Sequence, residues 1–372
     1  MLRIHILNVG HGDSIVLEYC GEGDHKSFAV IDSNCKPDSS PPALDLLRTL
    51  GANSLSFVAI THPHADHYMG MRAILESFSK KIETLYTFPI KKESEHLKKL
   101  LLAYKKNALA TTSDRIQKTN LELAHILALA SKSAAKSWEA PSGIKSLISA
   151  PGFPNQSIWA ILPPSRVKGR FFQGIIEGSI EPENEELNDL SLAFLIEYGG
   201  HQVILAGDGS KTNWGYQNKQ WKNAGIKFSP SVVKLPHHGS KYDCDATVQN
   251  IIFGDLKDQQ PNAIACISAD GKTHPSLDVL DGLTRRSIKP YCTNLSTRCG
   301  NTRNAILKSE GTDPALLRLI GSAVIDGDET VRPCQGNIVL ELLPGQPIKI
   351  TTQHNNLCAL RGDYEFLSSN IH

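Results

Sequence analysis

Short apolar runs separated by glycine and aspartate turns dominate the first third of the chain, and this alternation predicts β-strands. Residues 41–50 and 69–78 instead carry apolar side chains at helical spacing. The expected strands lie at residues 4–8, 14–19, 28–32 and 57–60. Because strands and helices alternate along this part of the chain, the pattern favours an α/β fold.

The second half of the chain contains two hairpin patterns. Residues 190–198 and 202–206 are apolar runs on either side of a Gly-Gly turn, which favours a hairpin. Residues 338–343 and 348–352 flank a Pro-Gly turn and predict a closing hairpin. Further strands are expected at residues 158–162, 232–235, 263–268 and 290–293.

Three segments interrupt the strand pattern. Residues 91–140 are rich in Leu, Ala and Lys at helical spacing and predict one or two long helices inserted between strands. Residues 169–188 are polar and acidic and are expected to form a mobile connection. Residues 301–332 are expected to be a variable insertion. The remaining pattern predicts a single domain over residues 1–372.

The insertion at residues 91–140 has far more basic than acidic side chains. One interpretation is a wall that attracts phosphate groups beside a catalytic site. The other, which is the commoner origin of such a pattern, is a solvated helix face. The apolar side chains around residues 97–104 and 121–129 also suggest a docking face for a protein partner. The basic residues are Lys91, Lys92, Lys98, Lys99, Lys105, Lys106, Arg115, Lys118, Lys132 and Lys136.

Composition changes this picture little. The formal net charge is +1 and 40% of residues are hydrophobic, so no global charge announces a nucleic-acid partner and none excludes it. The 8 cysteines form no C-x-x-C pair, which argues against a zinc ribbon. No signal-peptide pattern and no apolar run of about 18 residues is present. A cytoplasmic protein without a membrane segment is therefore expected.

The strongest chemical signal is the motif H-x-H-x-D-H at residues 62–67, directly after an expected buried strand. His62, His64 and His67 offer imidazole nitrogens and Asp66 offers a carboxylate, a mixture that suits Zn²⁺, Mn²⁺ or Fe²⁺. So tight a loop cannot bring all four to one ion. The spacing therefore suggests two neighbouring ions, as in hydrolytic sites whose metals lie about 3.5–4 Å apart.

Further polar residues follow other expected strands or turns. Asp208 ends a strand between glycines and is placed to bridge two metals, and His237 or His238 could complete a metal shell. Asp32, at another strand end, is expected to hold the ligand loops from behind. His11 and Asp13 lie in a glycine turn between the first two strands. They could face the metals, and a purely structural turn is equally compatible with the sequence.

These motifs, taken in order, resemble those of the metallo-β-lactamase superfamily. The turn at residues 8–14, the P-H-H-G-S element at 236–240 and T-H-P-S at 273–276 are similar in particular to the hydrolase domain of ComEC-type proteins. One departure concerns the first metal site, where many members carry another histidine and this chain offers Asn188 and Ser191. ComEC-type membrane segments are also missing from the sequence.

The resemblance implies an α/β fold of the αβ/βα four-layer metallo-β-lactamase type, with the helical insertion added. It also implies two divalent ions, Zn or Mn. His62, His64 and Asp208 would hold one ion; Asp66, His67, Asp208 and one of the adjacent histidines would hold the other. A water bridging them would become acidic enough to supply hydroxide near neutral pH. By the same resemblance, His274 lies near the pocket and could act as a general acid or grip a phosphate.

Three functions remain open at this level. The first is a phosphodiesterase or nuclease, favoured by the resemblance and by the basic insertion. The second is a hydrolase of small esters, lactones or phosphoesters. The third is a partner-regulated effector of a toxin or defence system, with the insertion at residues 91–140 as its docking element.

Overall fold

The computed structural model describes most of the chain with side chains. The described residues are 1–23, 25–36, 39–90, 95–177, 185–254, 263–270, 273–295 and 334–354. The expected variable insertion at residues 301–332 and the first part of the basic insertion, including Lys91 and Lys92, lie outside them.

The N-terminal half builds most of an eight-stranded sheet in the order β15-β14-β1-β2-β3-β4-β5-β6. β1, β2 and β3 form the predicted antiparallel meander, and β3 to β6 run parallel to one another. The predicted closing hairpin adds β14 beside β1. The strands are β1 (Leu2–Ile6), β2 (Ser14–Cys20), β3 (Lys26–Ser33), β4 (Leu55–Ile60), β5 (Ile82–Thr87), β6 (Ala135–Glu139), β14 (Ile338–Leu342) and β15 (Lys349–Thr352).

The second sheet has seven strands in the order β13-β12-β11-β10-β9-β8-β7. The hairpin of β9 and β10 is the one predicted at the Gly-Gly turn. From β10 to β13 the strands are parallel, so their carboxyl ends meet at one edge. The strands are β7 (Ser146–Leu147), β8 (Gln156–Leu162), β9 (Ala193–Tyr198), β10 (His201–Leu205), β11 (Val232–Lys234), β12 (Ile264–Ile267) and β13 (Lys289–Cys292).

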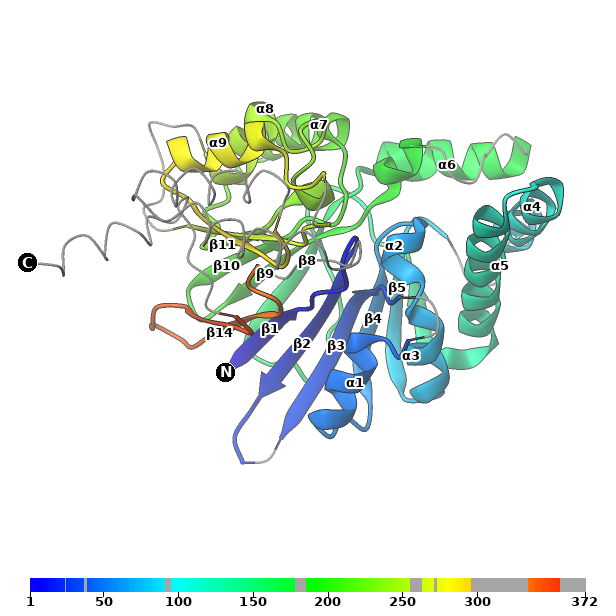
Figure 1. The fold of residues 1–372 in the computed structure, drawn as a ribbon, viewed down its shortest axis with the longest axis horizontal. Coiled ribbons are helices and arrows are strands. Elements are labelled where there is room, and N and C mark those ends of the chain that lie inside the picture. Colours follow the sequence, from blue (N-terminus) through cyan, green and yellow to red (C-terminus); the bar gives the residue numbers. More distant parts are fainter. Residues whose placement is uncertain are drawn as a thin grey trace, which may run out of the picture.

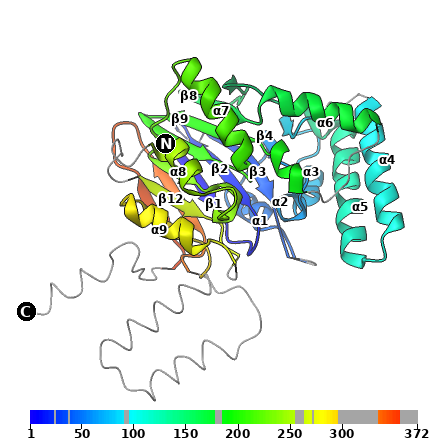
Figure 2. The same ribbon diagram turned by 90° about the horizontal axis from the view of Figure 1, so that it is seen from above.

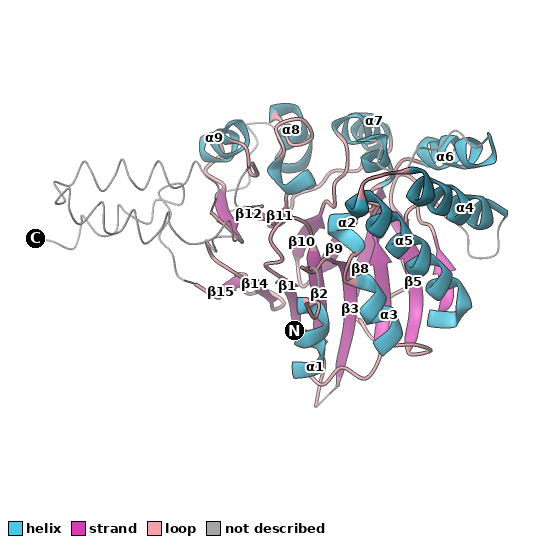
Figure 3. Ribbon diagram, turned by 45° about the vertical axis from the view of Figure 1, so that its right-hand side comes forward, coloured by secondary structure: helices cyan, strands magenta, loops and turns pink. Residues whose placement is uncertain are grey.

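The two sheets pack face to face between two helical layers (Figures 1 and 3). Ile15 and Leu17 of β2 point into the core between the sheets, whereas Val16 points into the core under the outer helices. This confirms the predicted four-layer αβ/βα arrangement. One layer contains α1 (Pro42–Thr49), α2 (Ala65–Tyr68), α3 (Met71–Ser77), α4 (Glu95–Ala110) and α5 (Asp114–Leu129). The other contains α7 (Lys211–Asn223), α8 (Ala246–Phe253) and α9 (Leu277–Arg285).

The basic insertion forms two helices, α4 and α5, followed by a π-helical turn and the edge strand β6. Leu97 and Tyr104 of α4 and Leu123 of α5 are buried in the core under the outer helices. The apolar faces that suggested partner docking therefore pack inside the protein. Leu102 and Leu109 of α4 are instead exposed. A partner for this insertion stays a prediction.

The expectation of a mobile connection over residues 169–188 is wrong where the structure describes it. This stretch contains most of α6 (Ser165–Glu177) and the 3-10 helix η2 (Glu185–Leu190). Val167 and Phe171 lie one turn apart and bury against the outer core, which the surrounding polar residues hid in the sequence. Figure 2 shows α6 reaching the pair of α4 and α5. None of the helices in the described part of the chain is long and apolar enough to cross a bilayer.

Candidate metal centre

The carboxyl ends of strands from both sheets meet at one edge of the sandwich. In the first sheet, Asp32 lies near the end of β3 and the motif at residues 62–67 follows β4, which runs parallel to β3. In the second sheet, Asp208 follows β10 and the histidine pair follows the parallel strand β11. The backbone N–H of Leu192 donates to the carbonyl of Thr61 at 3.1 Å and joins the two edges.

Four side chains converge at this edge: Asp66, His67, Asp208 and His238. Each offers one ligand atom, and these atoms all lie within 4.8 Å of one another. Nε2 of His67 is 3.3 Å from Oδ2 of Asp208 and 3.7 Å from Oδ2 of Asp66. Nε2 of His238 is 3.4 Å and 3.3 Å from the same two oxygens. The structure thus brings together a mixed nitrogen and oxygen set from three loops.

These residues fit a bound metal ion. Nε2 of His67 and Nε2 of His238 are buried and have no hydrogen-bond partner, although carboxylate oxygens lie close by. An unpartnered buried polar atom is costly, and a shared cation would satisfy both nitrogens. Ligand atoms of a tetrahedral zinc site, with bonds of about 2.0–2.2 Å, are about 3.3–3.6 Å apart. The observed separations lie in or just above this range.

The charge balance of the group also suits a cation. Burial by itself would raise the pKa of Asp208, but His238 and His67 hold it well below its usual range. Burial lowers the pKa of His238, yet Asp208 and Asp66 raise it to about 9. Without a metal ion, the carboxylates therefore favour a proton on this imidazole. A divalent cation would take the place of that proton, because ligand histidines must be neutral.

His62 and His64 form a separate pair beside this group. Nε2 of His62 is 3.1 Å from Nδ1 of His64 and 3.9 Å from Oδ2 of Asp208. Burial, followed by the charges of His67 and His64, places the pKa of His62 well below its usual value, so the ring is neutral and able to act as a ligand. Among the described residues, however, neither potential metal group of three or more side chains includes this pair.

Asp32 holds His67 from behind. Its Oδ2 accepts from Nδ1 of His67 at 2.7 Å, which leaves Nε2 directed toward the other ligands. Its two oxygens also accept from the backbone and hydroxyl of Thr61, at 2.8 Å and 2.7 Å. This is the carboxylate–histidine arrangement that orients metal ligands, and it is the role predicted for Asp32. The backbone of Asp32 is left-handed, with φ of +55°.

Asp13 lies behind His238 and is paired with a buried lysine. Its Oδ1 is 3.7 Å from Nδ1 of His238, and its Oδ2 accepts from Nζ of Lys234. Both side chains are almost fully buried. Burial would raise the pKa of Asp13, but Lys234 and His238 bring it below its usual value. The sequence predicts no role for Lys234, although a lysine at the end of the apolar strand β11 is a signal that could have indicated one.

Two glycines permit the close approach of these loops. Gly12 has φ of +108°, and a Cβ there would lie 2.0 Å from the carbonyl oxygen of Asp66. Gly207 has φ of +52°, and a Cβ there would lie 2.5 Å from Oγ of Ser191. That hydroxyl accepts from the backbone N–H of Asp208 at 2.9 Å. Ser191 therefore positions the loop that carries Asp208.

His237 and His238 have different surroundings. His238 is fully buried within the group of four, whereas the side chain of His237 is 27% exposed. Nδ1 of His237 donates to Asp243 at 2.6 Å and lies 3.5 Å from Nδ2 of Asn188. Burial lowers the pKa of His237, but the bond to Asp243 and the charge of Asp208 bring it above its usual value. His238 is thus the better-placed ligand, and Asn188 contacts the neighbouring histidine.

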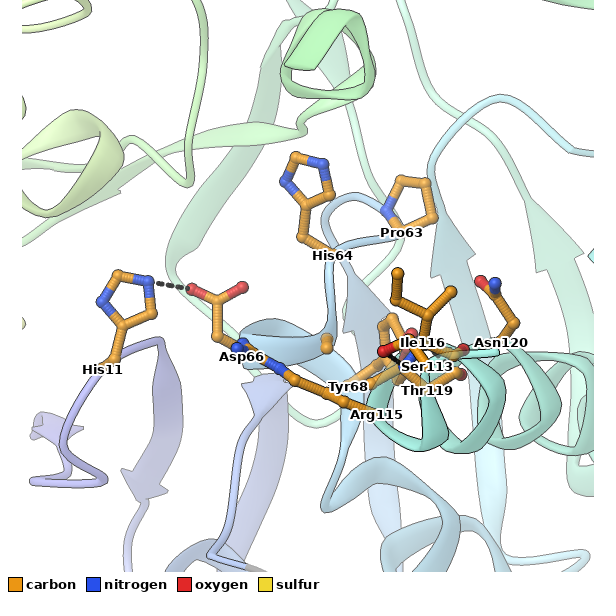
Figure 4. A pocket seen from close by; sticks show the side chains of 11 residues that line it. His11, Pro63, His64, Asp66, Tyr68, Ser113, Arg115, Ile116, Thr119 and Asn120 are labelled. Atoms are coloured by element: carbon orange, nitrogen blue, oxygen red, sulfur yellow. Dashed lines mark hydrogen bonds and ion pairs between the residues drawn. The ribbon is translucent and has the colours of Figure 1, made fainter. Parts of the chain in front are cut away.

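His11 and His274 form a ring-lined wall above the four ligands. Nε2 of His11 is 3.0 Å from Oδ2 of Asp66, and its ring centroid lies 4.9 Å from that of His238. The ring of His274 lies 5.9 Å from that of His237 and 6.1 Å from that of His11. Burial lowers the pKa of His274, so its imidazole is neutral near neutral pH. A cavity of about 470 Å³ opens beside this wall (Figure 4).

Comparisons with known proteins add fold likenesses at low identity. No family model and no curated protein matches the sequence. Among solved structures, the metallo-β-lactamase fold protein YhfI from Bacillus subtilis is 10% identical, with 78% of this chain and 95% of that chain covered and a TM-score of 0.38. Zn²⁺-bound PqqB from Methylobacterium extorquens is 11% identical, with 78% and 98% covered and a TM-score of 0.38.

Two further solved structures are similar at the same level. A diphosphatase from the PhnP family is 11% identical, with 80% of this chain and 87% of that chain covered and a TM-score of 0.36. CmlA β-hydroxylase is 11% identical over 79% of this chain, which spans 52% of that longer protein, with a TM-score of 0.39. At this level of identity the likenesses concern the fold alone.

Proposed function

We propose that this protein is a metal-dependent hydrolase of the metallo-β-lactamase type that acts on phosphodiesters. The observation that carries the proposal is the convergence of Asp66, His67, Asp208 and His238, whose ligand atoms all lie within 4.8 Å of one another beside a cavity. The two buried Nε2 atoms form no hydrogen bond, although both lie within ion-pair distance of the carboxylates. A divalent cation shared by the four ligand atoms would take the place of the protons in those ion pairs.

Asp66, His67, Asp208 and His238 would hold one ion, Zn²⁺ or Mn²⁺, and His62 with His64 would contribute to a second ion next to Asp208. When bound, such ions acidify water and stabilise negative charge that develops on a substrate oxygen. Asp32 holds the ring of His67 by a hydrogen bond of 2.7 Å and so restricts it before any substrate arrives. Oδ1 of Asp13 lies 3.7 Å from Nδ1 of His238, and the two atoms form no hydrogen bond.

His274 supplies proton chemistry on the open side of the group. Its ring is neutral near neutral pH, and a neutral imidazole carries one N–H that can donate to a leaving oxygen. His11 is held by Asp66 and faces the same space. His11 and Arg115 both line the cavity and give it polar groups that suit an anionic substrate, and the ring of His274 lies 6.1 Å from that of His11.

The test is hydrolysis by purified protein supplied with Mn²⁺ or Zn²⁺. Substrates would include single- and double-stranded DNA and RNA, chromogenic phosphodiesters, and a panel of small esters and lactones. The matched control is the Asp66→Ala/His67→Ala double variant, whose folding is checked by circular dichroism. We expect metal-dependent cleavage of phosphodiesters by the wild type alone. Equal cleavage by the control would refute the proposal, and cleavage of carboxylic esters only would favour the small-ester alternative.

A further inference from the structure

The cavity beside the candidate metal centre has two walls from distant parts of the sequence. One wall is the metal-loop region, with His64, Asp66 and Tyr68. The other is the first turns of α5, from the basic insertion (Figure 4). The volume of about 470 Å³ lies within the range of small-molecule binding sites. The cavity therefore has room for a ligand of about the size of a nucleotide.

The insertion is fastened to the metal loop and not merely adjacent to it. The hydroxyl of Tyr68, on the short helix that carries Asp66, donates to the carbonyl of Thr119 on α5 at 3.0 Å. Ser113 caps α5 by accepting from the backbone N–H of Ile116 at 3.4 Å. The N-terminal end of a 16-residue helix, where the helix dipole favours negative charge, thus borders the cavity.

Arg115 is the charged group of this wall. Its side chain extends from α5 across the cavity toward Asp66 (Figure 4). It is exposed, and no hydrogen bond or ion pair connects it to any residue in the described part of the chain. Of the basic residues that the structure describes in the insertion, Arg115 alone lines this cavity. Arg115 thus suits the interpretation of the insertion as a phosphate-attracting wall, whereas the other described basic residues of the insertion suit a solvated helix face.

Asn120 provides an independent sign of a ligand. Its side chain is 2% exposed, it lines the same cavity, and its Nδ2 has no hydrogen-bond partner. An unpartnered buried donor is costly, and it requires an acceptor. Pro63 of the metal loop and Ile116 of α5 add apolar surface to the lining. The lining therefore combines an arginine, an amide donor and a small apolar face.

We propose that Arg115 and Asn120 form a substrate subsite for the phosphate ester that the metal-dependent hydrolase cleaves. Arg115 binds an anionic phosphate oxygen, and Asn120 donates to an acceptor on the attached organic group, which lies against Ile116. The ligand class is a phosphodiester with a ring-bearing group of about nucleotide size, either free or at the end of a nucleic-acid strand. The identity of the substrate class rests on the proposed function, whereas the anion subsite does not.

The test measures binding and hydrolysis separately. Calorimetric titrations would use thymidine monophosphate p-nitrophenyl ester, a short single-stranded oligothymidylate, and thymidine as the uncharged comparison. Each is titrated into protein stripped with EDTA and into protein loaded with Zn²⁺. The variants are Arg115→Ala, Arg115→Lys and Asn120→Ala. Lys118→Ala is the matched control, because Lys118 is an exposed basic residue of α5 that does not line the cavity.

We expect Arg115→Ala to weaken binding of the phosphate probes by about 10- to 100-fold, with Arg115→Lys in between and Lys118→Ala unchanged. Thymidine should bind weakly to all forms and respond only to Asn120→Ala. Stronger binding of the oligothymidylate than of the mononucleotide ester would identify a strand end as the source of the phosphate.

Three outcomes overturn the subsite. The first is equal probe binding by Arg115→Ala and wild type, and the second is no binding of either phosphate probe by wild type. The third is an effect of Arg115→Ala on Zn²⁺ affinity alone, which would mean that Arg115 only balances the charge of Asp66. Arg115-dependent binding without hydrolysis would instead refute the proposed function and leave the subsite standing.

Discussion

The two halves of the motif at residues 62–67 contain similar side chains but have different surroundings. Asp66 and His67 meet Asp208 and His238, and all four ligand atoms lie within 4.8 Å of one another. Nε2 of His62 lies 3.1 Å from Nδ1 of His64 and 3.9 Å from Oδ2 of Asp208. One half of the loop therefore belongs to a group of four potential metal ligands, called here the complete group, whereas His62 and His64 belong to no group of three or more in the described part of the chain.

The difference extends to the groups behind the ligands. His67 donates to the carboxylate of Asp32, and His238 faces the carboxylate of Asp13. Nδ1 of His62 instead lies 3.0 Å from the hydroxyl of Thr61, and among the described residues no carboxylate bonds to it. Carboxylates behind histidines raise their basicity and fix their orientation. We therefore expect the ion held by the complete group to bind more tightly than any ion at His62 and His64.

The largest expected effect comes from removing a ligand of the complete group. His238→Ala should abolish the tightly bound ion, with a loss of affinity beyond the roughly 10–100-fold typical of outer partners. His64→Ala should leave that ion in place and lower only the total stoichiometry. Metal content after dialysis, measured by mass spectrometry, distinguishes the two. If His238→Ala retained the ion and His64→Ala lost it, the tight site would be the one at His62 and His64 instead.

Breaking the buried pair behind His238 should strongly reduce stability. Lys234→Met leaves the carboxylate of Asp13 buried without its cation, a change that typically costs about 3–5 kcal/mol of unfolding free energy. The double variant Lys234→Met/Asp13→Asn removes both charges and should recover much of the loss. Urea denaturation of both variants and of wild type measures this. No recovery in the double variant would mean that the lysine acts through packing.

The outer partner of His67 can be compared with that of His237. Asp32→Asn should weaken metal affinity by about 10–100-fold, because His67 loses its charged acceptor. Asp243→Asn makes the matching change behind His237, which lies outside the group of four, and should leave metal affinity nearly unchanged. Competition with a chromogenic chelator gives both values. A larger effect at Asp243 would identify His237 as the ligand in place of His238.

A buried carboxylate in a separate cluster provides a reference for these charges. Glu18 contacts His5, Lys26 and Arg3. The hydrogen bond with His5 outweighs the effect of burial and lowers the pKa of Glu18 to about 2. An ordinary glutamate has a pKa of about 4.3. Ionised Glu18 therefore stabilises the fold above about pH 4.3, and this contribution is lost as the pH falls toward about 2.

Glu18→Gln should cost about 1–2 kcal/mol at neutral pH, after allowance for solvent screening of Arg3 and Lys26, and progressively less below about pH 4. Denaturation at several pH values, with and without Zn²⁺, measures the difference. A cost that stays constant down to about pH 2 would contradict the lowered pKa. A cost that depends on Zn²⁺ would mean that the two clusters are coupled.

The positions of most strands and the two hairpins could be predicted from the sequence alone, whereas β5 (Ile82–Thr87), β6 (Ala135–Glu139) and β7 (Ser146–Leu147) could not. Local periodicity marks strands and helices, and a histidine or aspartate directly after a buried strand marks a strand end. Asp32, Asp66 and Asp208 were recognised in this way. Helix α6 is not predicted because its few buried apolar residues lie among polar ones, and only tertiary packing, such as the contact of Phe171 with the ring of Phe88, gives them a core.

Tertiary structure decided which of these residues act together. The sequence placed His237 and His238 side by side, but left-handed backbone at both turns one into the group and the other toward Asp243. Lys234 pairs with Asp13, which lies 221 positions away, and Arg115 lines the same cavity as the metal loop because Tyr68 joins that loop to α5. Such contacts depend on the register of two sheets and on the docking of a helix. Residue type and local spacing do not encode either one.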